Sequence, residues 1–380
     1  MITTCQNTFR YLRRPSAGWA LLACVAALTV LGMIMLTSAG SSFNSDSFYL
    51  FRKQFIWLAL ALIAGVVAAT FDLDRLGRMS HLIALGVLVL LGLVATPGVG
   101  VEVNGARRWL DLGMMRLQVS DLAKVALIIW LAHYYGQRQR KVAECWAGFG
   151  APCAVIGLCC GLIFLQPDFG TAALCGAVGF SMMYLAGARL WYLVPSMITG
   201  VTAFSVAVYY DPVRLRRITS FLDVEGNKSD SSYQLWQGIL AFGAGGVPGV
   251  GLGQGRQQLS FLPEAHTDFI FPVIGEELGL VATAGVVLLF AVIFIAVVAS
   301  LKKAPNLYQF LLAVGALLFL TLQAIINMGV VTGLLPTKGM SLPFISYGGT
   351  NLVTMFVLVG LLLNCLVSWS ASPLLRPREL

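Results

Sequence analysis

Charged residues are scarce in this sequence: 11% of its 380 residues are Asp, Glu, Lys or Arg, whereas 58% are hydrophobic. Apolar runs of about twenty residues recur along the chain, which is the length that a membrane-spanning helix needs. Because backbone in lipid must satisfy its hydrogen bonds internally, this pattern predicts an all-α polytopic membrane protein. Rules that count soluble domains from chain length therefore do not apply.

The net charge of +8 does not indicate nucleic-acid binding. The basic residues are scattered over short segments between the apolar runs, and they form no stripe along one face. Such a distribution is typical of topology signals in membrane proteins, so we expect no nucleic-acid partner.

Histidine is scarcer still, and cysteine is missing from every predicted outer loop. His81 and His133 lie near the predicted inner ends of their spans, so they cannot join His266 at the outer face, and a histidine-rich zinc site is excluded. The eight cysteines lie in spans or on the inner side without metal-knuckle spacing, which excludes a disulfide framework. No Ser-x-x-Lys serine with its companion motifs occurs, so we do not expect the chain to cross-link peptides.

The apolar runs predict about ten transmembrane helices. They lie at roughly 19–36, 55–69, 82–94, 122–134, 149–165, 171–185, 190–208, 269–300, 307–331 and 352–369. An even number of spans puts both termini on one side, and the short loops of that side carry about twice as many Lys and Arg residues as those of the other. We therefore predict cytoplasmic tails at 1–18 and 370–380, one transmembrane domain over 19–369, and within it a large extracytoplasmic loop at about 209–267. Most acidic residues then face outward.

One outer stretch, Val103-Asn-Gly-Ala-Arg-Arg-Trp-Leu110, combines a turn signal with two cations. Asn-Gly marks a tight turn, and Arg107 and Arg108 follow it beside Trp109. The stretch could be an interfacial anchor, with the indole in the headgroup region. It could also be an anion clamp, because guanidinium groups match phosphate oxygens in bidentate fashion.

Two further outer stretches interrupt the apolar runs. In Gln166-Pro-Asp-Phe-Gly-Thr171, Asp168 could cap the following helix or could join Gln166 in an outward-facing polar cavity. The stretch 333–349 holds proline and glycine at a density that no helix tolerates. Because non-helical backbone at membrane depth occurs only inside protein or beside a watery cavity, we expect a re-entrant or tightly folded segment there, with a plain connecting loop as the alternative. This segment carries Lys338, Ser346 and Tyr347.

The stretch from Phe261 to Gly279 gathers ionisable side chains where a polar loop enters an apolar run. These are Glu264, His266, Asp268, Glu276 and Glu277. Pro272 follows Asp268 by one helical turn and lacks an N–H, so we expect a kink and a carbonyl at Asp268 without its helical donor. Asp268 could merely favour a helix start, and the two later glutamates could pair with basic residues of neighbouring spans. Catalysis or transport is the alternative, since ionisable groups at a membrane entrance are costly.

The glycine-rich run 243–255 is similar to a phosphate-binding loop in composition alone. No strand-then-helix context surrounds it, and its predicted place is extracytoplasmic, where nucleotides are scarce. We expect it to provide close packing of the outer loop over the membrane face.

Taken together, these stretches resemble the SEDS family of shape, elongation, division and sporulation proteins, from about Trp19 to Trp369. The resemblance rests on Asn104-Gly-Ala-Arg-Arg-Trp109, Gln166-Pro-Asp-Phe-Gly-Thr171, Leu262-Pro-Glu-Ala-His-Thr-Asp-Phe-Ile-Phe271 with Gly275-Glu-Glu-Leu-Gly279, and Leu335-Pro-Thr-Lys-Gly-Met-Ser-Leu-Pro-Phe-Ile-Ser-Tyr-Gly-Gly349. Lys338 and Ala265 are more similar to the cell-division branch than to the elongation branch. Two positions depart from the family pattern, with Gln118-Val-Ser-Asp121 in place of Gln-Pro-Ser-Glu and Pro272 in place of a small residue.

The resemblance implies a peptidoglycan glycosyltransferase in the bacterial inner membrane. Such an enzyme polymerises lipid II, an undecaprenyl-pyrophosphate-linked disaccharide peptide, at the outer face of that membrane, here in septal wall synthesis during division. The family's proposed catalytic aspartate falls on Asp268, which we expect to act as the base toward the acceptor 4-hydroxyl, with Glu264 orienting it. Arg107, Arg108 and Lys338 would stabilise the leaving pyrophosphate, with a divalent cation such as Mg²⁺ or Mn²⁺ as an optional cofactor. The expected substrate contacts also include Gln166, Asp168, His266 and Ser346.

A chain that does not cross-link peptides needs a separate class B penicillin-binding transpeptidase, which a division-branch member would meet with other divisome proteins at the septum. A lipid II flippase or transporter is the main alternative, because Glu276 and Glu277 inside the membrane would suit a transport path. A flippase needs polar groups along the whole path, whereas catalytic acids gather at the outer face. A catalytically silent scaffold is the third interpretation, and it predicts no loss on Asp268→Asn.

Overall fold

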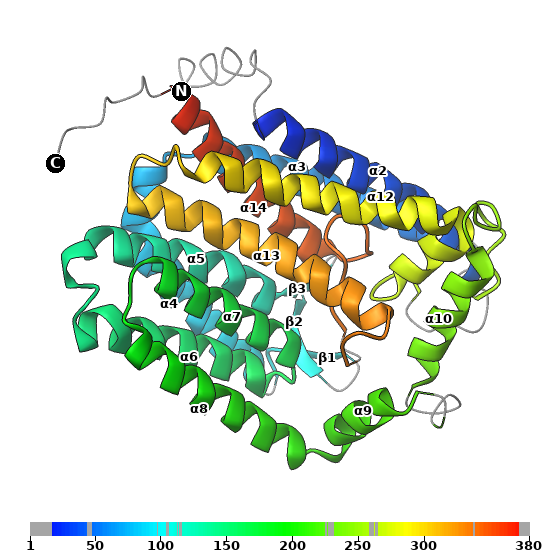
Figure 1. Ribbon diagram of the computed structural model, residues 1–380, viewed down its shortest axis with the longest axis horizontal. Helices are drawn as coiled ribbons and strands as arrows, with labels where there is room; N and C mark the ends of the chain where they lie inside the picture. The colour runs from blue at the N-terminus through cyan, green and yellow to red at the C-terminus, as the bar shows by residue number, and fades with distance from the viewer. Residues whose placement is uncertain are drawn as a thin grey trace.

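Long apolar helices make up most of the structure. The computed structural model describes residues 17–43, 48–96, 98–103, 106–111, 113, 116–224, 226, 232–257, 262, 265–336 and 339–371. Figure 1 shows the helices packed side by side as a bundle.

The elements follow one another in a simple order. The helices are α2 (Ala17–Phe43), α3 (Tyr49–Thr70), α4 (Leu73–Ala95), α5 (Val119–Gln137), α6 (Ala151–Leu165), α7 (Phe169–Leu185), α8 (Leu190–Tyr209), α9 (Pro212–Leu222), α10 (Tyr233–Gly245), α12 (Ile270–Leu301), α13 (Leu307–Val331) and α14 (Gly349–Ala371). The strands are β1 (Val101–Val103), β2 (Ala106–Asp111) and β3 (Arg116–Gln118). A 3₁₀ turn (Gln139–Lys141) follows α5, and a π-helical turn (Cys145–Gly150) runs into α6.

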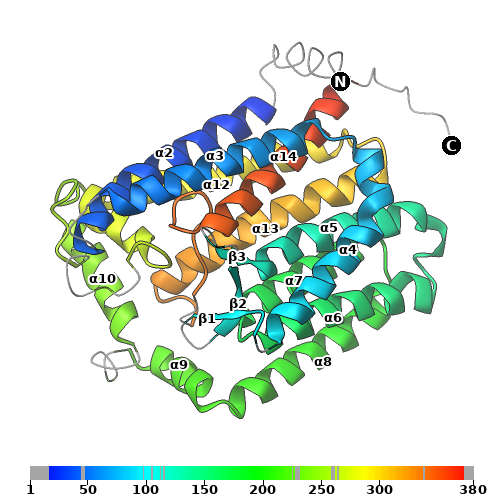
Figure 2. The same cartoon turned by 180° about the vertical axis from the view of Figure 1, so that it is seen from behind.

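The ten predicted spans all correspond to helices. Among the described residues, eight helical stretches are long and apolar enough to cross a membrane, counting 145–165 as one. The two others are α7, which is apolar but 17 residues long, and α5, whose 19 residues include Asp121 and Lys124. The start of α2 and the end of α14 lie at the same end of the bundle (Figure 1 and Figure 2), as an even number of spans requires. That this end is cytoplasmic stays a prediction.

Polar caps mark the turns between neighbouring helices. At the start of α4, the Asp72 carboxylate accepts hydrogen bonds from the backbone N–H groups of Asp74 and Arg75, at 2.9 and 3.4 Å. Asn306 caps α13 in the same way through the N–H of Gln309, at 2.9 Å. These side chains satisfy N–H groups that the first helical turn leaves without a partner.

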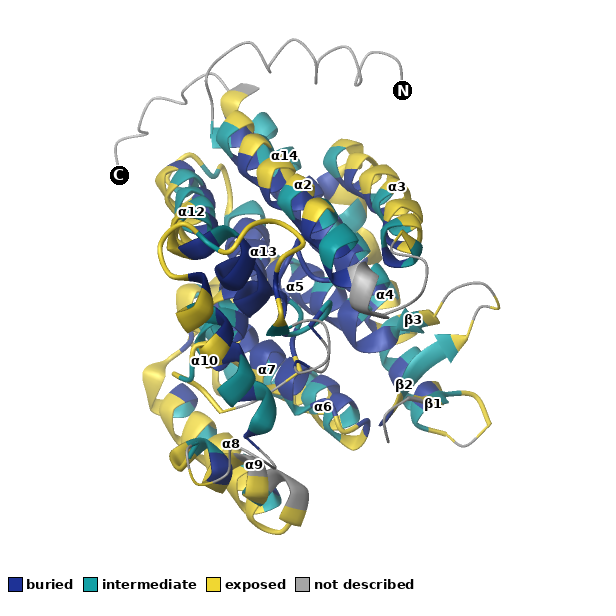
Figure 3. Ribbon diagram, turned by 90° about the vertical axis from the view of Figure 1, so that its right-hand side faces the viewer, coloured by how far each residue is buried: buried dark blue, intermediate teal, exposed yellow. Residues whose placement is uncertain are grey.

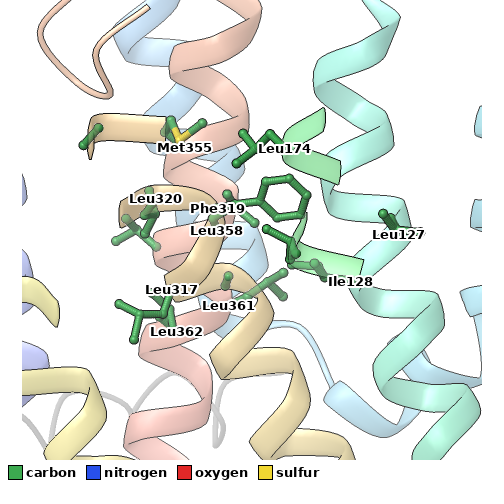
Figure 4. Close-up of a cluster of buried hydrophobic side chains, with 14 of the residues drawn as sticks. Leu127, Ile128, Leu174, Leu317, Phe319, Leu320, Met355, Leu358, Leu361 and Leu362 are labelled. Carbon is green, nitrogen blue, oxygen red and sulfur yellow. The ribbon is translucent and has the colours of Figure 1, made fainter. Parts of the chain in front are cut away.

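The core lies where α5, α7, α13 and α14 meet. Figure 4 shows Ile128 of α5, Leu174 of α7, Phe319 of α13 and Leu358 of α14 in one cluster, and all four are buried. α13 is deeply placed, with 67% of its most apolar stretch inside the protein, against 11% for α8. Exposed positions collect on the outer helices (Figure 3). Apolar side chains that stay exposed there fit a surface that faces lipid.

The chain is not entirely α-helical, because a small antiparallel sheet lies between α4 and α5. Its strand order is β1-β2-β3, with Trp109 of β2 paired to Gln118 of β3. The sheet contacts α4, α5 and α14. The predicted turn at Asn104 and Gly105 lies outside the described residues. Strands of three to six residues are too short to give a recognisable alternation in sequence, which is why the all-α prediction missed them.

The predicted large loop at 209–267 contains helices of its own. α9 begins at Pro212, directly after α8, and α10 packs against α12. Figure 1 shows α8, α9 and α10 following one another around the edge of the molecule. Through α10, the loop at 209–267 therefore packs against α12, the helix that follows Asp268.

α12 is broken, although not where the sequence predicts. The helix begins at Ile270, so Pro272 lies in its first turn, where a missing N–H breaks no bond within the helix. The predicted kink at Pro272 is therefore wrong. The break lies at Gly279, whose φ of 75° and ψ of −171° suit a residue without a side chain.

The glycine-rich run packs closely, as predicted, and it does so over this break in α12; its packing over the membrane face stays a prediction. The backbone N–H of Val250 donates to the carbonyl of Glu276 at 2.9 Å. The N–H of Gly251 donates to the carbonyl of Glu277 at the same distance, and the N–H of Leu280 donates back into the run at 2.9 Å. These bonds replace the helical ones that the break removes, because buried backbone groups need partners.

Candidate active site

Asp268 lies in the turn at 265–269 that leads into α12, and its side chain is partly exposed. Asp268 precedes the N-cap residue Phe269, so its backbone carbonyl lies outside the helix, and Pro272 has no N–H to offer it, as predicted. Asn327 Nδ2 in α13 donates to that carbonyl instead, at 2.9 Å. The same Nδ2 atom donates to the carbonyl of Met340 at 2.6 Å. One amide thus joins the Asp268 turn to the segment at 332–348.

The backbone of that segment passes directly beside the Asp268 carboxylate. A Cβ placed on Gly339 would lie 2.7 Å from Asp268 Oδ2, closer than real Cβ contacts come. Only a residue without a side chain fits there unless the carboxylate moves. The absence of a side chain at this position therefore helps to define where the carboxylate can lie.

Residues 340–346 of the segment at 332–348 are folded inside the protein, as predicted, whereas most of the described residues from 332 to 336 are exposed. Met340, Leu342 and Ile345 are at most 5% exposed. Phe344 adopts the left-handed φ of 67°, and Ser346 Oγ accepts a hydrogen bond from Leu342 N at 2.8 Å. Ser346 was predicted to contact substrate, but it is 3% exposed and its hydroxyl closes a turn.

His266 is brought to the same segment. The backbone N–H of Tyr347 donates to the carbonyl of His266 at 2.9 Å, and the two rings lie 5.8 Å apart. Burial raises the pKa of the Tyr347 hydroxyl, and the nearby cation of Lys53 opposes that rise. The structure therefore gathers His266, Asp268 and the folded segment at one end of the bundle. Glu264 and Lys338, the other two residues predicted here, lie outside the described residues.

Asp168 caps a helix and also holds a cation. Its Oδ1 accepts from the backbone N–H of Thr171 at 3.2 Å, at the start of α7. Its Oδ2 accepts from Gln118 Nε2 at 3.1 Å and from Ser120 Oγ at 3.0 Å. Arg108 Nη1 lies 3.8 Å from the same oxygen. The capping role is confirmed, and the carboxylate fixes Arg108 as well.

Gln166 does not join Asp168 in an outward-facing cavity, as the sequence had suggested. Its Nε2 donates to the carbonyl of Leu91 at the end of α4, at 2.9 Å, and the residue is 1% exposed. The side chain therefore ties the turn between α6 and α7 to α4.

Arg107 and Arg108 point to different partners, because successive side chains of a strand face opposite sides. Arg107 Nε pairs with Glu102 Oε2 across the sheet at 2.9 Å, and both side chains are about half exposed. Arg108 is 27% exposed and turns toward Asp168. Among the described residues, Arg108 Nε is buried without a hydrogen-bond partner. The two guanidinium groups therefore form no joint clamp, and Arg108 keeps a donor for an anion.

A buried ion pair that the sequence analysis missed lies in α5. Lys124 Nζ is 2.8 Å from Asp121 Oδ1, and the side chains are 3% and 4% exposed. Lys124 Nζ also donates to Gln323 Oε1 of α13, at 2.9 Å. Gln323 Nε2 in turn donates to the carbonyl of Ser341 at 2.9 Å. The ion pair is thus continuous with the segment at 332–348.

Three buried polar residues of this region escaped the sequence analysis. Lys124, Gln323 and Asn327 lie inside predicted spans, and the last two are one helical turn apart on α13. A polar side chain inside an apolar span is costly unless it has a partner. Their positions inside long apolar runs, and the one-turn spacing of Gln323 and Asn327, are the signals that could have identified them.

The Glu276 side chain ties the loop at 209–267 to α12, and the Glu277 side chain ties α12 to α2. Glu276 Oε1 accepts from the backbone N–H groups of Arg256 and Gln257, at 2.7 and 3.2 Å. Ser38 Oγ donates to Glu277 Oε1 at 2.6 Å. Both glutamates are at most 2% exposed, which fits a structural role beside the break in the helix.

The predicted divalent cation is not tested by the described residues, which leave out Glu264. Among the described residues, no three His, Cys, Asp or Glu side chains gather as metal ligands. A divalent-cation cofactor therefore stays a prediction.

His81 and His133 lie far from Asp268, as predicted. Their rings are 6.0 Å apart, and His133 borders a cavity of about 440 Å³ that is also lined by Asn306. Asn306 precedes α13, whereas Asn327, which contacts Asp268, lies near the other end of that helix. The two histidines and the Asp268 turn therefore lie at opposite ends of the bundle.

Comparison with known proteins gives matches over nearly the whole chain. The profile of the FtsW/RodA/SpoVE family of cell cycle proteins matches residues 19–370. The probable peptidoglycan glycosyltransferase FtsW of Halorhodospira halophila is 43% identical over 352 residues, covering 90% of this chain and 88% of that relative. The probable peptidoglycan glycosyltransferase FtsW of Methylococcus capsulatus is 41% identical over 349 residues, with the same coverage.

Solved structures are similar in fold. One comes from "Structural coordination of polymerization and crosslinking by a peptidoglycan synthase complex": its TM-score is 0.78 at 28% identity, covering 93% of this chain and 98% of that chain. The rod shape determining protein RodA of Thermus thermophilus gives a TM-score of 0.69 at 28% identity, covering 92% of this chain and 96% of that chain.

Proposed function

Because this chain belongs to the FtsW/RodA/SpoVE family of cell cycle proteins, we propose that it is a peptidoglycan glycosyltransferase that polymerises lipid II during cell division. The observation that carries the proposal is the partly exposed Asp268 carboxylate at the entry to α12. Its backbone is held by Asn327, and its carboxylate lies against Gly339. A carboxylate on a partly exposed residue whose backbone is held in place suits a catalytic base.

Asp268 is the general base of the proposed reaction. Its carboxylate takes the proton of the acceptor sugar's 4-hydroxyl while that oxygen attacks C1 of the donor sugar. The bond between C1 and the pyrophosphate oxygen breaks, and undecaprenyl pyrophosphate leaves with the electron pair. A positioned acid or base contributes about 10²- to 10⁴-fold to such a step.

Arg108 is the cation that we assign to the leaving pyrophosphate. Its side chain is held near Asp168 and keeps a buried donor for which the described residues offer no partner. A guanidinium group fits phosphate oxygens, and its charge stabilises the charge that develops on the leaving group. Because Asp168 already orients Arg108, the cation needs little reorganisation when the substrate binds.

The sheet that carries Arg108 is tied to the segment that passes Asp268. The backbone N–H of Gln118 in β3 donates to Thr350 Oγ1 at 3.1 Å, and Thr350 lies directly after that segment, at the start of α14. The proposed base and the proposed cation are therefore linked through one short stretch of chain.

Arg108→Gln is expected to lower the polymerisation rate by about tenfold or more, because it removes the positive charge assigned to the leaving group. Arg107→Gln is the matched control on the same strand. Arg107 pairs with Glu102 at the exposed surface, and exposed pairs contribute little, so its rate should stay within about twofold of the wild type. Initial rates on lipid II measure both. Equal losses in the two variants would contradict the assignment.

Gly339→Ala is expected to reduce kcat in a protein that still folds. The added Cβ would lie 2.7 Å from Asp268 Oδ2, so the carboxylate must turn away. A misplacement of about 1 Å costs up to about 10²-fold in rate. Gly157→Ala in α6 is the control, because a Cβ there meets no atom within 4 Å. If Gly339→Ala polymerises lipid II as fast as the wild type, the carboxylate is not constrained in this way.

A class B penicillin-binding transpeptidase is the partner that this function requires, since glycan strands must still be cross-linked. A related solved structure is of a complex that coordinates polymerisation with crosslinking, which supports this partnership. The FtsW relatives support a place in the bacterial inner membrane at the division septum. The outer face of that membrane is where lipid II and the partner would meet the Asp268 turn.

Reconstituted vesicles distinguish a polymerase from a transporter. Lipid II with a fluorescent label is placed in both leaflets, and glycan product and movement between leaflets are measured in the same sample. We expect glycan strands to form, with movement between leaflets no faster than in vesicles without protein. Faster movement of intact lipid II with no glycan product would favour the transporter instead.

A further inference from the structure

A single side-chain amide in α13 connects two segments that are far apart in the sequence. Asn327 Nδ2 donates to the carbonyl of Asp268 at 2.9 Å and to the carbonyl of Met340 at 2.6 Å. Asn327 is 2% exposed. Both partners are carbonyl oxygens, so the atom that faces them must be the amide nitrogen and not Oδ1.

Both carbonyls lie outside the helices, so helix formation alone gives them no donor. Pro272 lacks the N–H that would reach Asp268 from the next helical turn, and Met340 lies in non-helical backbone. Inside a membrane domain, a backbone carbonyl without a donor is costly. One Nδ2 group of Asn327 therefore supplies a hydrogen bond to both carbonyls. It can do so only while the two carbonyls stay close together.

We infer that Asn327 is a positioning residue that sets the direction of the Asp268 carboxylate, an inference that rests on the proposed function. Its bond fixes the backbone of residue 268 from one side. Its second bond fixes Met340, the neighbour of Gly339, and a Cβ added to Gly339 would lie 2.7 Å from Asp268 Oδ2. Figure 1 shows α12 and α13 as neighbours, so α13 is the support against which the turn is held.

The Nδ2 group of Asn327 is occupied by protein carbonyls, and the residue is 2% exposed, so its role is exerted through Asp268 and not by contact with the sugar. A change at Asn327 should therefore alter kcat and leave the KM for lipid II nearly unchanged. A residue that served only the stability of the bundle would lower the melting temperature with no such selective loss of kcat.

Asn327→Ala and a matched control, Asn364→Ala, test the inference. Asn364 Nδ2 in α14 also donates to two backbone carbonyls, those of Ala68 at 3.0 Å and Phe71 at 2.7 Å, near the inner ends of α3 and α14. Both variants lose an amide that bridges two carbonyls. We expect kcat to fall by about tenfold or more in Asn327→Ala alone, with KM within about twofold. Equal kcat in the two variants, or a change confined to KM, would overturn the inference.

A second substitution tests the Asp268 bond itself. Pro272→Ala restores an N–H one helical turn after Asp268, so Asn327→Ala with Pro272→Ala should recover part of the lost kcat. A double variant no faster than Asn327→Ala would count against the inference. If Asn327→Ala does not fold, Asn327→Gln keeps the donors and moves them by one methylene. It should then fold with a reduced kcat, and wild-type kcat would overturn the inference.

The two proposals fail in different ways. If the wild-type chain makes no glycan, the proposed function is wrong whatever the variants do. If the wild type is active and Asn327→Ala behaves as Asn364→Ala does, the positioning role alone is wrong.

Discussion

Asp268→Asn is expected to lower the rate of lipid II polymerisation by about 10²- to 10⁴-fold. The amide is almost the same size as the carboxylate, so it fits the space beside Gly339. It cannot take the proton of the acceptor hydroxyl, so the chemical step slows. The backbone carbonyl of residue 268 still accepts its bond from Asn327, so the fold and the KM for lipid II should change little.

Asp111→Asn is the control for this loss. Asp111 ends β2 at the surface, where its carboxylate accepts a hydrogen bond from the backbone N–H of Gly113 at 2.8 Å. The same change of charge is made there, away from the Asp268 turn, and the rate should stay within about twofold of the wild type because exposed charges contribute little. If Asp268→Asn folds well and polymerises lipid II as fast as Asp111→Asn, the result would favour the catalytically silent scaffold.

Lys124→Met is expected to be the most destabilising of the changes considered. It removes the cation from a pair whose side chains are 3% and 4% exposed, and it leaves the Asp121 carboxylate buried without that charge. Removing one partner of a buried ion pair costs about 3–5 kcal/mol. Gln323 Oε1 also loses its donor. A lower melting temperature of the purified protein in detergent or lipid measures the effect.

The double variant Asp121→Leu with Lys124→Met separates charge from packing. Replacing both ions by apolar groups of similar size is often close to neutral, so most of the lost stability should return. If the double variant melts as low as Lys124→Met, the unpaired charge is not the cause. If the melting temperature of Lys124→Met equals that of the wild type, the ion pair does not stabilise the protein as its geometry indicates.

Much of the fold could be predicted because the apolar interior of a membrane limits which backbone structures are stable there. Only helices satisfy the backbone within long apolar runs, so all ten predicted spans correspond to helices. Proline and glycine in 333–349 exclude a helix, which was enough to predict a folded segment, and its residues 340–346 are largely buried. The loop at 209–267 was harder, because α9 and α10 are short and partly polar.

The break at Gly279 and the pairing of polar residues could not be predicted in the same way. An isolated glycine in an apolar run is compatible with an unbroken helix, and the break depends on bonds from the distant glycine-rich run. The opposite directions of Arg107 and Arg108 depend on a strand too short to recognise. Asn327 contacts carbonyls on two other segments, and Lys124 contacts Gln323 of α13 as well as Asp121 of its own helix. A linear sequence does not show which distant segments supply such partners.

Release of undecaprenyl pyrophosphate by the purified chain tests the central claim most directly. Each disaccharide that joins the glycan strand must free one lipid pyrophosphate, so the two products are counted together, with the transpeptidase partner present. The account predicts equal amounts of both from the wild type and almost none of either from Asp268→Asn. Lipid II that remains intact with a well-folded wild-type chain and its partner would contradict the account.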